Sequence, residues 1–294
     1  MWIQDFIEYL RCEKNFSEHT AEAYSRDLKE FESYMKSVDE GISWNNLPRD
    51  VVRQWMVDEM DSGKTARTVC RHLSSIRSFY KFLVRRQLVQ TDPVHGLQGP
   101  KKSKPLPSYI READLDRLFS GDYFPETLEG MRDRLILLTF YTTGMRRAEL
   151  IGLDWTAVGF DDSQLRVTGK RNKQRIIPFG RELLCALADY KDALTEEFGI
   201  LPDPVFVNLH SLHRMTPESV GRIVHNALSL VTTTGKRSPH VLRHSFATSM
   251  LNHDANLQSV KELMGHESLA TTEIYTHTTF EELKKMYNQA HPRA

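Results

Sequence analysis

The second half of the chain contains six side chains of the types that bind or attack phosphate, and the last of them is a tyrosine. These catalytic candidates are Arg146, Lys170, His240, Arg243, His266 and Tyr275. Cleavage of a phosphodiester without water or a metal needs an enzyme nucleophile, cations that neutralise the pentavalent transition state, and a proton for the departing alkoxide. The set contains a candidate group for each of these tasks.

Two arginines are the candidates for transition-state neutralisation. Arg146 and Arg243 are expected to bind the non-bridging oxygens of one phosphate, because a guanidinium contacts two oxygens at once and stays charged. The turn Thr143-Gly144 places Arg146 at the start of a short helix, where backbone amides also favour an anion. Glu149 follows three residues after Arg146 on the same helical face, and is expected to orient it by pairing.

A helix start at Ser238-Pro239 brings a histidine next to the second arginine. Ser238 is a typical N-cap and Pro239 suits the first helical position, so His240 and Arg243 fall one turn apart on one face. The phenol of Tyr275 has an ordinary pKa of roughly 10 and needs activation at neutral pH. His240 is expected either to accept its proton or to bind a phosphate oxygen.

The remaining candidates are His266, expected to bind the opposite oxygen, and Lys170 at a hairpin tip, expected to protonate the leaving 5′ oxygen. The pair His240 and His244 has the spacing of a zinc-binding helix. Val241, however, stands where the metalloprotease pattern has a glutamate, so a metal site is not favoured. His244 is instead expected to be a packed histidine that donates to a backbone carbonyl.

The first 90 residues show the periodicity of an all-helical domain. The expected helices are Trp2–Glu13, Ser17–Lys36, Pro48–Met60 and Thr65–Arg86. The chain has 39 basic and 39 acidic side chains, yet residues 1–63 hold 14 acidic and 7 basic ones, whereas residues 64–86 hold 7 basic and no acidic ones. Such segregation indicates a face for a polyanion, although a solvated basic face has the same composition. The candidate DNA contacts here are Lys64, Arg67, Arg71, Arg77 and Lys81.

Residues 91–110 are rich in proline, glycine and lysine and lack periodicity, which predicts a linker. Its Lys101 and Lys102 are candidate phosphate contacts, or simply keep a tether soluble. A second domain over residues 111–294 is expected to be mostly helical, with the strands Gln164–Thr168 and Arg175–Phe179 forming a hairpin. Its expected helices are Glu112–Phe119, Leu128–Tyr141, Arg181–Glu197, Pro217–Leu230, Pro239–Asn252, Leu257–Met264 and Phe280–Asn288.

Several classes of protein are disfavoured by composition. Forty per cent hydrophobic residues argue against disorder, and the longest apolar stretch, near Leu135–Tyr141, is too short to span a bilayer. The beginning of the chain has no signal-like pattern, so a soluble, cytoplasmic protein is expected. The three cysteines, Cys12, Cys70 and Cys185, lack metal-ligand spacing and are expected to be buried, reduced thiols. No metal or cofactor is expected.

Over nearly its full length the chain resembles the tyrosine recombinases, and most closely their Xer branch. The resemblance lies in the amino-acid sequence of five segments, residues 143–146, 169–175, 240–248, 263–275 and 291–294. It implies a mainly α, two-domain, C-shaped clamp on DNA, with a helical core-binding domain and a catalytic domain holding a small antiparallel sheet. The first five catalytic candidates would activate the phosphate, and Tyr275 would attack it. The products would be a 3′-phosphotyrosine and a free 5′ hydroxyl, which attacks the partner strand through a Holliday junction without ATP or metal.

The resemblance also implies a biological setting. We expect resolution of chromosome dimers at a terminus site; integration or excision of a mobile element and non-cutting DNA regulation are the alternatives. The expected partners are double-stranded DNA with a specific recombination site, a homo- or hetero-tetramer with a second recombinase, and a septal DNA translocase. Arg171 replaces the glycine common in relatives, so Lys173 becomes a second candidate acid and DNA contact. The expected last helix, Phe280–Asn288, has an apolar face. We expect this face to be buried either against its own domain or against a neighbouring subunit.

Overall fold

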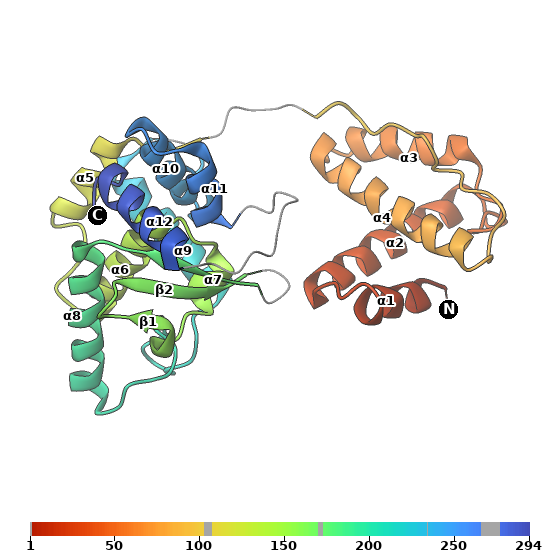
Figure 1. Cartoon of the computed structure of the whole chain (residues 1–294). Coiled ribbons are helices and arrows are strands. Elements are labelled where there is room, and N and C mark those ends of the chain that lie inside the picture. The colour runs from red at the N-terminus through yellow and green to blue at the C-terminus, as the bar shows by residue number, and fades with distance from the viewer. Residues whose placement is uncertain (1, 103–107, 170–172, 234, 266–276) are drawn as a thin grey trace. The chain divides into compact units, whose positions relative to one another are not determined.

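The computed structural model describes residues 2–102, 108–169, 173–233, 235–265 and 277–294. The chain divides into two compact units, Met1–Pro105 and Leu106–Ala294, which are coloured from red to yellow and from yellow to blue in Figure 1. Part of the stretch expected as a linker belongs to the first unit, because Val94 and Leu97 are buried in its core. The backbone carbonyl of Leu97 also accepts a hydrogen bond from Arg77.

The first unit is all-helical, as its periodicity predicts. Its helices are α1 (Trp2–Cys12), α2 (Glu18–Val38), α3 (Arg49–Asp61) and α4 (Ala66–Arg85). Thr65 caps α4 by accepting a hydrogen bond from the backbone N–H of Thr68. Ser17 occupies the N-cap position of α2, but its hydroxyl lies 2.9 Å from Thr20 Oγ1 and makes no capping bond.

The second unit is mostly helical with a small antiparallel sheet in the order β1-β2-β3. Its strands are β1 (Val158–Gly159), β2 (Gln164–Thr168) and β3 (Gln174–Pro178). Its helices are α5 (Glu112–Ser120), α6 (Leu128–Thr143), α7 (Arg147–Ile151), α8 (Arg181–Phe198), α9 (Pro217–Val231), α10 (Pro239–Asn252), α11 (Leu257–Met264) and α12 (His277–Ala290), with a short 3₁₀ turn at Trp155–Ala157. The two-residue strand β1 was not expected from the sequence. It pairs Val158 with Leu165 at the edge of the hairpin.

Helix α6 forms the centre of the second unit and packs against α8 and α10. It ends at Gly144, whose φ of 58° lies in the left-handed region. A Cβ at this position would lie 2.3 Å from Cδ1 of Phe246 on α10, so glycine is required by both conformation and space. This close turn places Arg146 directly before α7.

Helix α12 packs against α10, α11 and β3 of its own unit. Leu283 and Tyr287 of its apolar stripe are buried in a cluster with Phe246 and Leu263. The residues after α12 continue this packing, since His291 is buried and stacks on Tyr287 with 5.1 Å between ring centroids. In this structure the apolar face of α12 is thus buried against its own domain, which is one of the two alternatives that the sequence left open.

Two expectations of burial were wrong. Cys12 and Cys185 are exposed, and Cys70 is half-buried with its thiol donating to the carbonyl of Pro100. His244 is exposed on α10, since the buried face of this helix passes through Arg243 and Phe246 instead. Among the described residues, no helix is both long enough and apolar enough to cross a membrane.

Candidate functional site

The structure brings together three of the six catalytic candidates. Arg146 lies at the N-cap of α7, and His240 and Arg243 lie in the first two turns of α10. Lys170, His266 and Tyr275 lie outside the described residues. The first two follow directly after described neighbours, and Tyr275 shortly precedes the start of α12.

Arg146 is held by Glu149, as its position three residues earlier predicts. The backbone N–H of Arg146 donates to Glu149 Oε2 at 2.7 Å, and its Nη1 donates to Oε1 at 2.9 Å. Nη2 of the same guanidinium donates to the carbonyl of Gly265 at 2.8 Å. The Arg146 side chain is 40% exposed, so its fixed guanidinium remains accessible to a ligand.

Arg243 is almost fully buried, at 6% exposure. Its Nη1 donates to the carbonyl of Gly144 at 2.5 Å, and its Nη2 to the carbonyl of Met264 at 2.6 Å. Burial, followed by repulsion from Arg146 and Arg175, lowers the pKa of this guanidinium to about 10, against the opposing effect of Glu149. Arg243 is therefore charged at neutral pH in a place that favours the arrival of an anion.

Arg175 of β3 is a site residue that the sequence reasoning missed. It is 7% exposed, and its Nη1 and Nη2 donate to the two carboxylate oxygens of Glu149 at 2.7 and 2.9 Å. Arg175 pairs across the sheet with Val167, and both side chains face the core. The signal was available, because alternation along Arg175, Ile177 and Phe179 puts a charged residue on an inward-facing strand position.

Glu149 stays ionised although it is buried. Burial raises the pKa of its carboxyl, but the hydrogen bonds and charge of Arg175, together with the hydrogen bonds from Arg146, outweigh this and hold the pKa at about 2. A buried carboxylate of this kind needs several donors to satisfy its oxygens. The fold therefore places more guanidinium groups than carboxylates at this site, because both Arg146 and Arg175 pair with Glu149.

His240 lies in the first turn of α10 and is exposed. Burial by its neighbours lowers the pKa of its imidazole from the ordinary value of 6.5, and the charge of Arg243 lowers it further, followed by smaller contributions from His244, Arg147 and Arg146. The imidazole is therefore neutral at neutral pH. In that form it can accept a proton.

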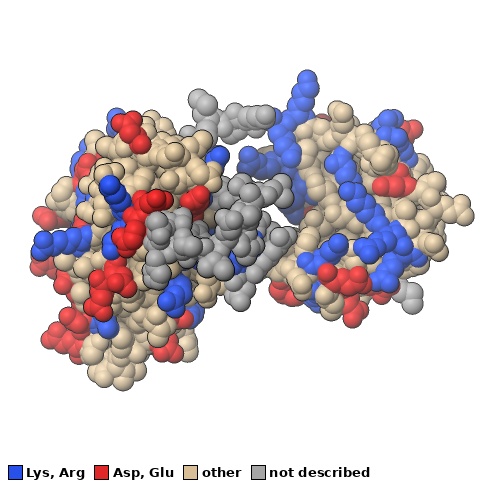
Figure 2. Space-filling view, viewed as in Figure 1, with Lys and Arg blue, Asp and Glu red and all other residues tan. Residues whose placement is uncertain are grey.

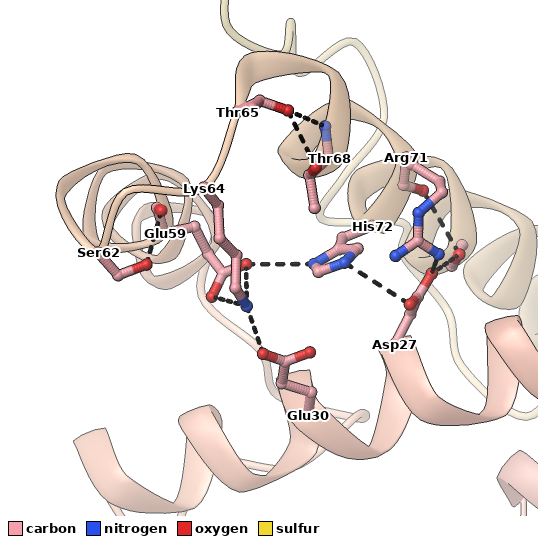
Figure 3. Close-up of polar contacts among 10 residues, drawn as sticks. Asp27, Glu30, Glu59, Ser62, Lys64, Thr65, Thr68, Arg71 and His72 are labelled. Carbon is pink, nitrogen blue, oxygen red and sulfur yellow. Dashed lines mark hydrogen bonds and ion pairs between the residues drawn. The ribbon is translucent and has the colours of Figure 1, made fainter. Parts of the chain in front are cut away.

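The candidate DNA contacts of the first unit differ in their surroundings. Lys64 is paired with Glu30 and Glu59, and Arg71 donates to the buried Asp27 at 2.6 Å. His72 lies between these two pairs, with its ring nitrogens facing Glu59 and Asp27 (Figure 3). The carboxylates thus hold Lys64, which lies just before α4, and Arg71, which lies on α4.

Other basic candidates are less constrained. Arg67, Lys81, Lys101 and Lys102 are exposed, and Arg77 is half-buried. Figure 2 shows Lys and Arg side chains gathered on the visible face of the first unit, beside smaller acidic groups. Lys173 is exposed at the base of the β2–β3 turn, where its carbonyl accepts a hydrogen bond from Gly169 at 2.7 Å.

Comparison with known proteins identifies the family of the chain. The model of the "Phage integrase family" matches residues 109–282, and that of the "Phage integrase, N-terminal SAM-like domain" matches residues 3–87. The chain is 35% identical to tyrosine recombinase XerD of Oceanobacillus iheyensis over 99% of this chain and 98% of that protein. It is also 35% identical to tyrosine recombinase XerC of Pediococcus pentosaceus, over 98% of this chain and 97% of that protein.

Solved structures show the same fold. The XerH site-specific recombinase bound to palindromic difH substrate in a post-cleavage complex matches with a TM-score of 0.72 and 19% identity, over 96% of this chain and 82% of that one. A lambda integrase dimer bound to a COC' core site matches with a TM-score of 0.65 and 17% identity, over 93% of this chain and 97% of that one. With both domain models matched in order and relatives of this identity along its length, the chain belongs to the phage integrase family of tyrosine recombinases, which cleave and rejoin DNA.

Proposed function

We propose that this protein is a site-specific recombinase of the Xer type, in which Tyr275 attacks a DNA phosphate and becomes linked to the 3′ end. The 5′ hydroxyl released by this step would attack the partner strand, exchanging strands through a Holliday junction. The oxygen–phosphorus bond to the tyrosine forms as the bond to the 5′ oxygen breaks. The number of phosphodiester bonds is conserved when the incoming 5′ hydroxyl displaces the tyrosine.

The observation that carries the proposal is the convergence of Arg146 and Arg243 at the start of α7 and α10. Repulsion from Arg146 adds to the effect of burial in lowering the pKa of Arg243, so the two positive charges act on each other. A phosphate placed between them would relieve this repulsion and receive several charge-assisted hydrogen bonds. The arrangement therefore suits the extra negative charge of a pentavalent phosphate.

The remaining roles in the proposal follow from residue chemistry. His240, which is neutral at neutral pH, accepts the phenol proton of Tyr275 or binds an oxygen. His266 binds the opposite non-bridging oxygen. Lys170, or Lys173 in its place, protonates the leaving 5′ oxygen.

The proposed DNA partner is a duplex carrying a specific recombination site. The exposed residues Arg67 and Lys81 on α4 are proposed to contact its phosphates, together with Lys101, Lys102 and the paired residues Lys64, Arg71 and Arg77. The two units are proposed to clamp the duplex, and the active assembly to be a tetramer of this chain alone or with a second recombinase. Replacement of Arg67 or Lys81 by alanine is expected to reduce the salt slope of DNA binding by about 1.

Resolution of chromosome dimers in the cytoplasm is the proposed biological role, because the curated relatives given above are named XerD and XerC. A septal DNA translocase is the proposed partner that controls it. Mapping of the protein on its own genomic DNA tests this role. Occupancy of one site near the replication terminus is expected, whereas occupancy at the ends of a mobile element would contradict it.

The chemistry is tested with a nicked suicide duplex that contains the sequence selected by the protein from a random library. The wild-type protein is expected to form a covalent adduct that survives denaturation. The Tyr275→Phe variant is expected to bind the duplex with unchanged affinity and to form no adduct. No adduct with the wild type, or an adduct with the variant, would overturn the proposal.

A further inference from the structure

Three arginines from different elements bind three successive backbone carbonyls at the end of α11. Arg175 Nε donates to Leu263 at 2.9 Å, Arg243 Nη2 to Met264 at 2.6 Å, and Arg146 Nη2 to Gly265 at 2.8 Å. The last carbonyls of a helix lack partners within the helix and carry its partial negative charge, so cations stabilise them. The helix end that precedes His266 in the sequence is thereby fixed to the phosphate-binding arginines.

Arg175 differs from the other two arginines in what its remaining donors do. Its terminal nitrogens are directed to both oxygens of Glu149, and the same carboxylate holds Arg146. The contacts to Leu263 and Glu149 account for all three nitrogens of this guanidinium, which is buried. Arg175 therefore faces protein groups, whereas the guanidinium of Arg146 is accessible.

Two glycines allow this close packing. A Cβ at Gly265, where φ is 62°, would lie 3.2 Å from Cζ and Nε of Arg175. A Cβ at Gly169, at the base of the β2–β3 turn, would lie 3.3 Å from Glu149 Oε1. The Glu149–Arg175 pair thus lies against Gly265 and Gly169, which precede His266 and Lys170 in the sequence.

We propose that Arg175 is a positioning residue for DNA cleavage, and that it acts through Glu149 and the end of α11. It keeps Glu149 ionised, so that the carboxylate orients Arg146 toward the phosphate. It also fixes the register of the chain before His266 relative to both phosphate-binding arginines. This inference rests on the proposed function, because it concerns the rate of the cleavage step.

The test replaces Arg175 with lysine and with glutamine and measures single-turnover cleavage of the suicide duplex at saturating protein. Each variant is expected to cleave ~10- to 100-fold more slowly, since small misplacements of catalytic groups have effects of this size. DNA affinity is expected to change less than about threefold, because Arg175 contacts no phosphate. The lysine variant keeps the positive charge, and it separates loss of the fork geometry from loss of folding.

The pH profile of cleavage distinguishes positioning from a purely structural role. Without the charge of Arg175, the pKa of the buried Glu149 rises, so the Arg175→Gln variant is expected to lose cleavage as the pH falls from about 8 to about 5, more steeply than the wild type. Adding Glu149→Gln to the Arg175→Gln variant is expected to remove this extra dependence. The two substitutions together are also expected to lower the rate by less than the product of their separate effects.

Arg132→Gln is the matched control, because Arg132 is a largely buried arginine paired with Asp133 in the same unit. It is expected to lower thermal stability without changing the cleavage rate of the folded protein or its pH profile. Arg175 variants that behave like this control, or rate losses that multiply with Glu149→Gln, would overturn the inference. Absence of an adduct with the wild type would instead contradict the proposed function.

Discussion

Arg175 donates two hydrogen bonds, of 2.7 and 2.9 Å, to the carboxylate of Glu149, and this carboxylate holds Arg146 three residues before it. The pair joins β3 to α7 inside the second unit. Arg175, which is buried, thereby orients the accessible Arg146 through the carboxylate of Glu149. This carboxylate is itself buried, so solvent and ligands cannot easily reach it. The geometry gives Arg146, which we propose to bind the phosphate, a defined orientation before DNA arrives.

The first prediction concerns the two arginines expected to bind the phosphate. Arg146→Lys and Arg243→Lys keep the charge but lose the planar fork, so cleavage is expected to fall ~100- to 1,000-fold, the effect of losing a transition-state donor. The measurement is single-turnover cleavage at saturating protein. Arg166→Lys, on the exposed face of β2, is the control and is expected to cleave normally. Equal losses in all three variants would contradict the assignment.

Glu149 is expected to make folding stability depend on acidity. Its pKa is lowered from 4.5 to about 2 in the folded protein, so its contribution is present above pH 4.5 and is lost as the pH falls toward 2. The shift corresponds to about 3 kcal/mol of unfolding free energy. Urea unfolding at pH 7 and at about pH 3 measures it. Glu149→Gln is expected to lose less stability between these two conditions than the wild type, and an equal loss would contradict the pairing.

His291 is expected to add a second, higher window of pH dependence. Burial lowers its pKa from 6.5 to about 4, against the hydrogen bond to the Tyr141 carbonyl, and its Nδ1 accepts the backbone N–H of Arg293. The unfolded chain therefore takes up a proton first, and stability is lost as the pH falls from 6.5 to 4, by about 3 kcal/mol.

Thermal melting between these pH values tests the role of His291. His291→Phe keeps a ring against Tyr287 but does not titrate, and is expected to lose less stability as the pH falls through this window. His19→Gln, at a histidine side chain that is 98% exposed, is the control and is expected to follow the wild type. A His291→Phe curve parallel to the wild-type curve would refute the prediction.

Alanine substitutions at Gly144 and Gly199 distinguish the stability cost of backbone strain from that of steric overlap. Both have positive φ, of 58° and 67°, but a Cβ at Gly144 would overlap the ring of Phe246, whereas a Cβ at Gly199 would meet nothing within 4 Å. Gly199→Ala is expected to cost about 1 kcal/mol of unfolding free energy, and Gly144→Ala at least about twice that. Urea unfolding compares them. Equal losses of unfolding free energy would show that the turn before Arg146 can shift to accommodate a Cβ, and would contradict the prediction.

Local patterns predicted much of the fold. The bounds of α10 and α11 agree with the sequence because Ser238-Pro239 is an unambiguous start and Gly265 an unambiguous stop. The pairing of Arg146 with Glu149 was predictable for the same reason, since both residues lie in one turn. Cap identity was less informative about side-chain contacts, because Ser238 occupies the N-cap of α10 without a capping hydrogen bond.

Long-range contacts could not be predicted in this way. The bonds from Arg175 and Arg243 to the end of α11 join segments that helical spacing does not relate, and they depend on how β3 and α10 pack. The inward position of Arg175 was visible in strand alternation, but its carboxylate partner was not. The exposure of His244 likewise depends on which face of α10 meets α6.

The central claim is that Tyr275 forms the covalent bond to DNA. The most direct measurement is digestion of the purified protein–DNA adduct, followed by mass spectrometry of the nucleotide-linked peptide and labelling of both DNA ends at the break. The account predicts a phosphodiester on the side chain of Tyr275, joined to a 3′ end, with a free 5′ hydroxyl opposite it. A nucleotide attached to any other residue, or joined through a 5′ phosphate, would contradict it.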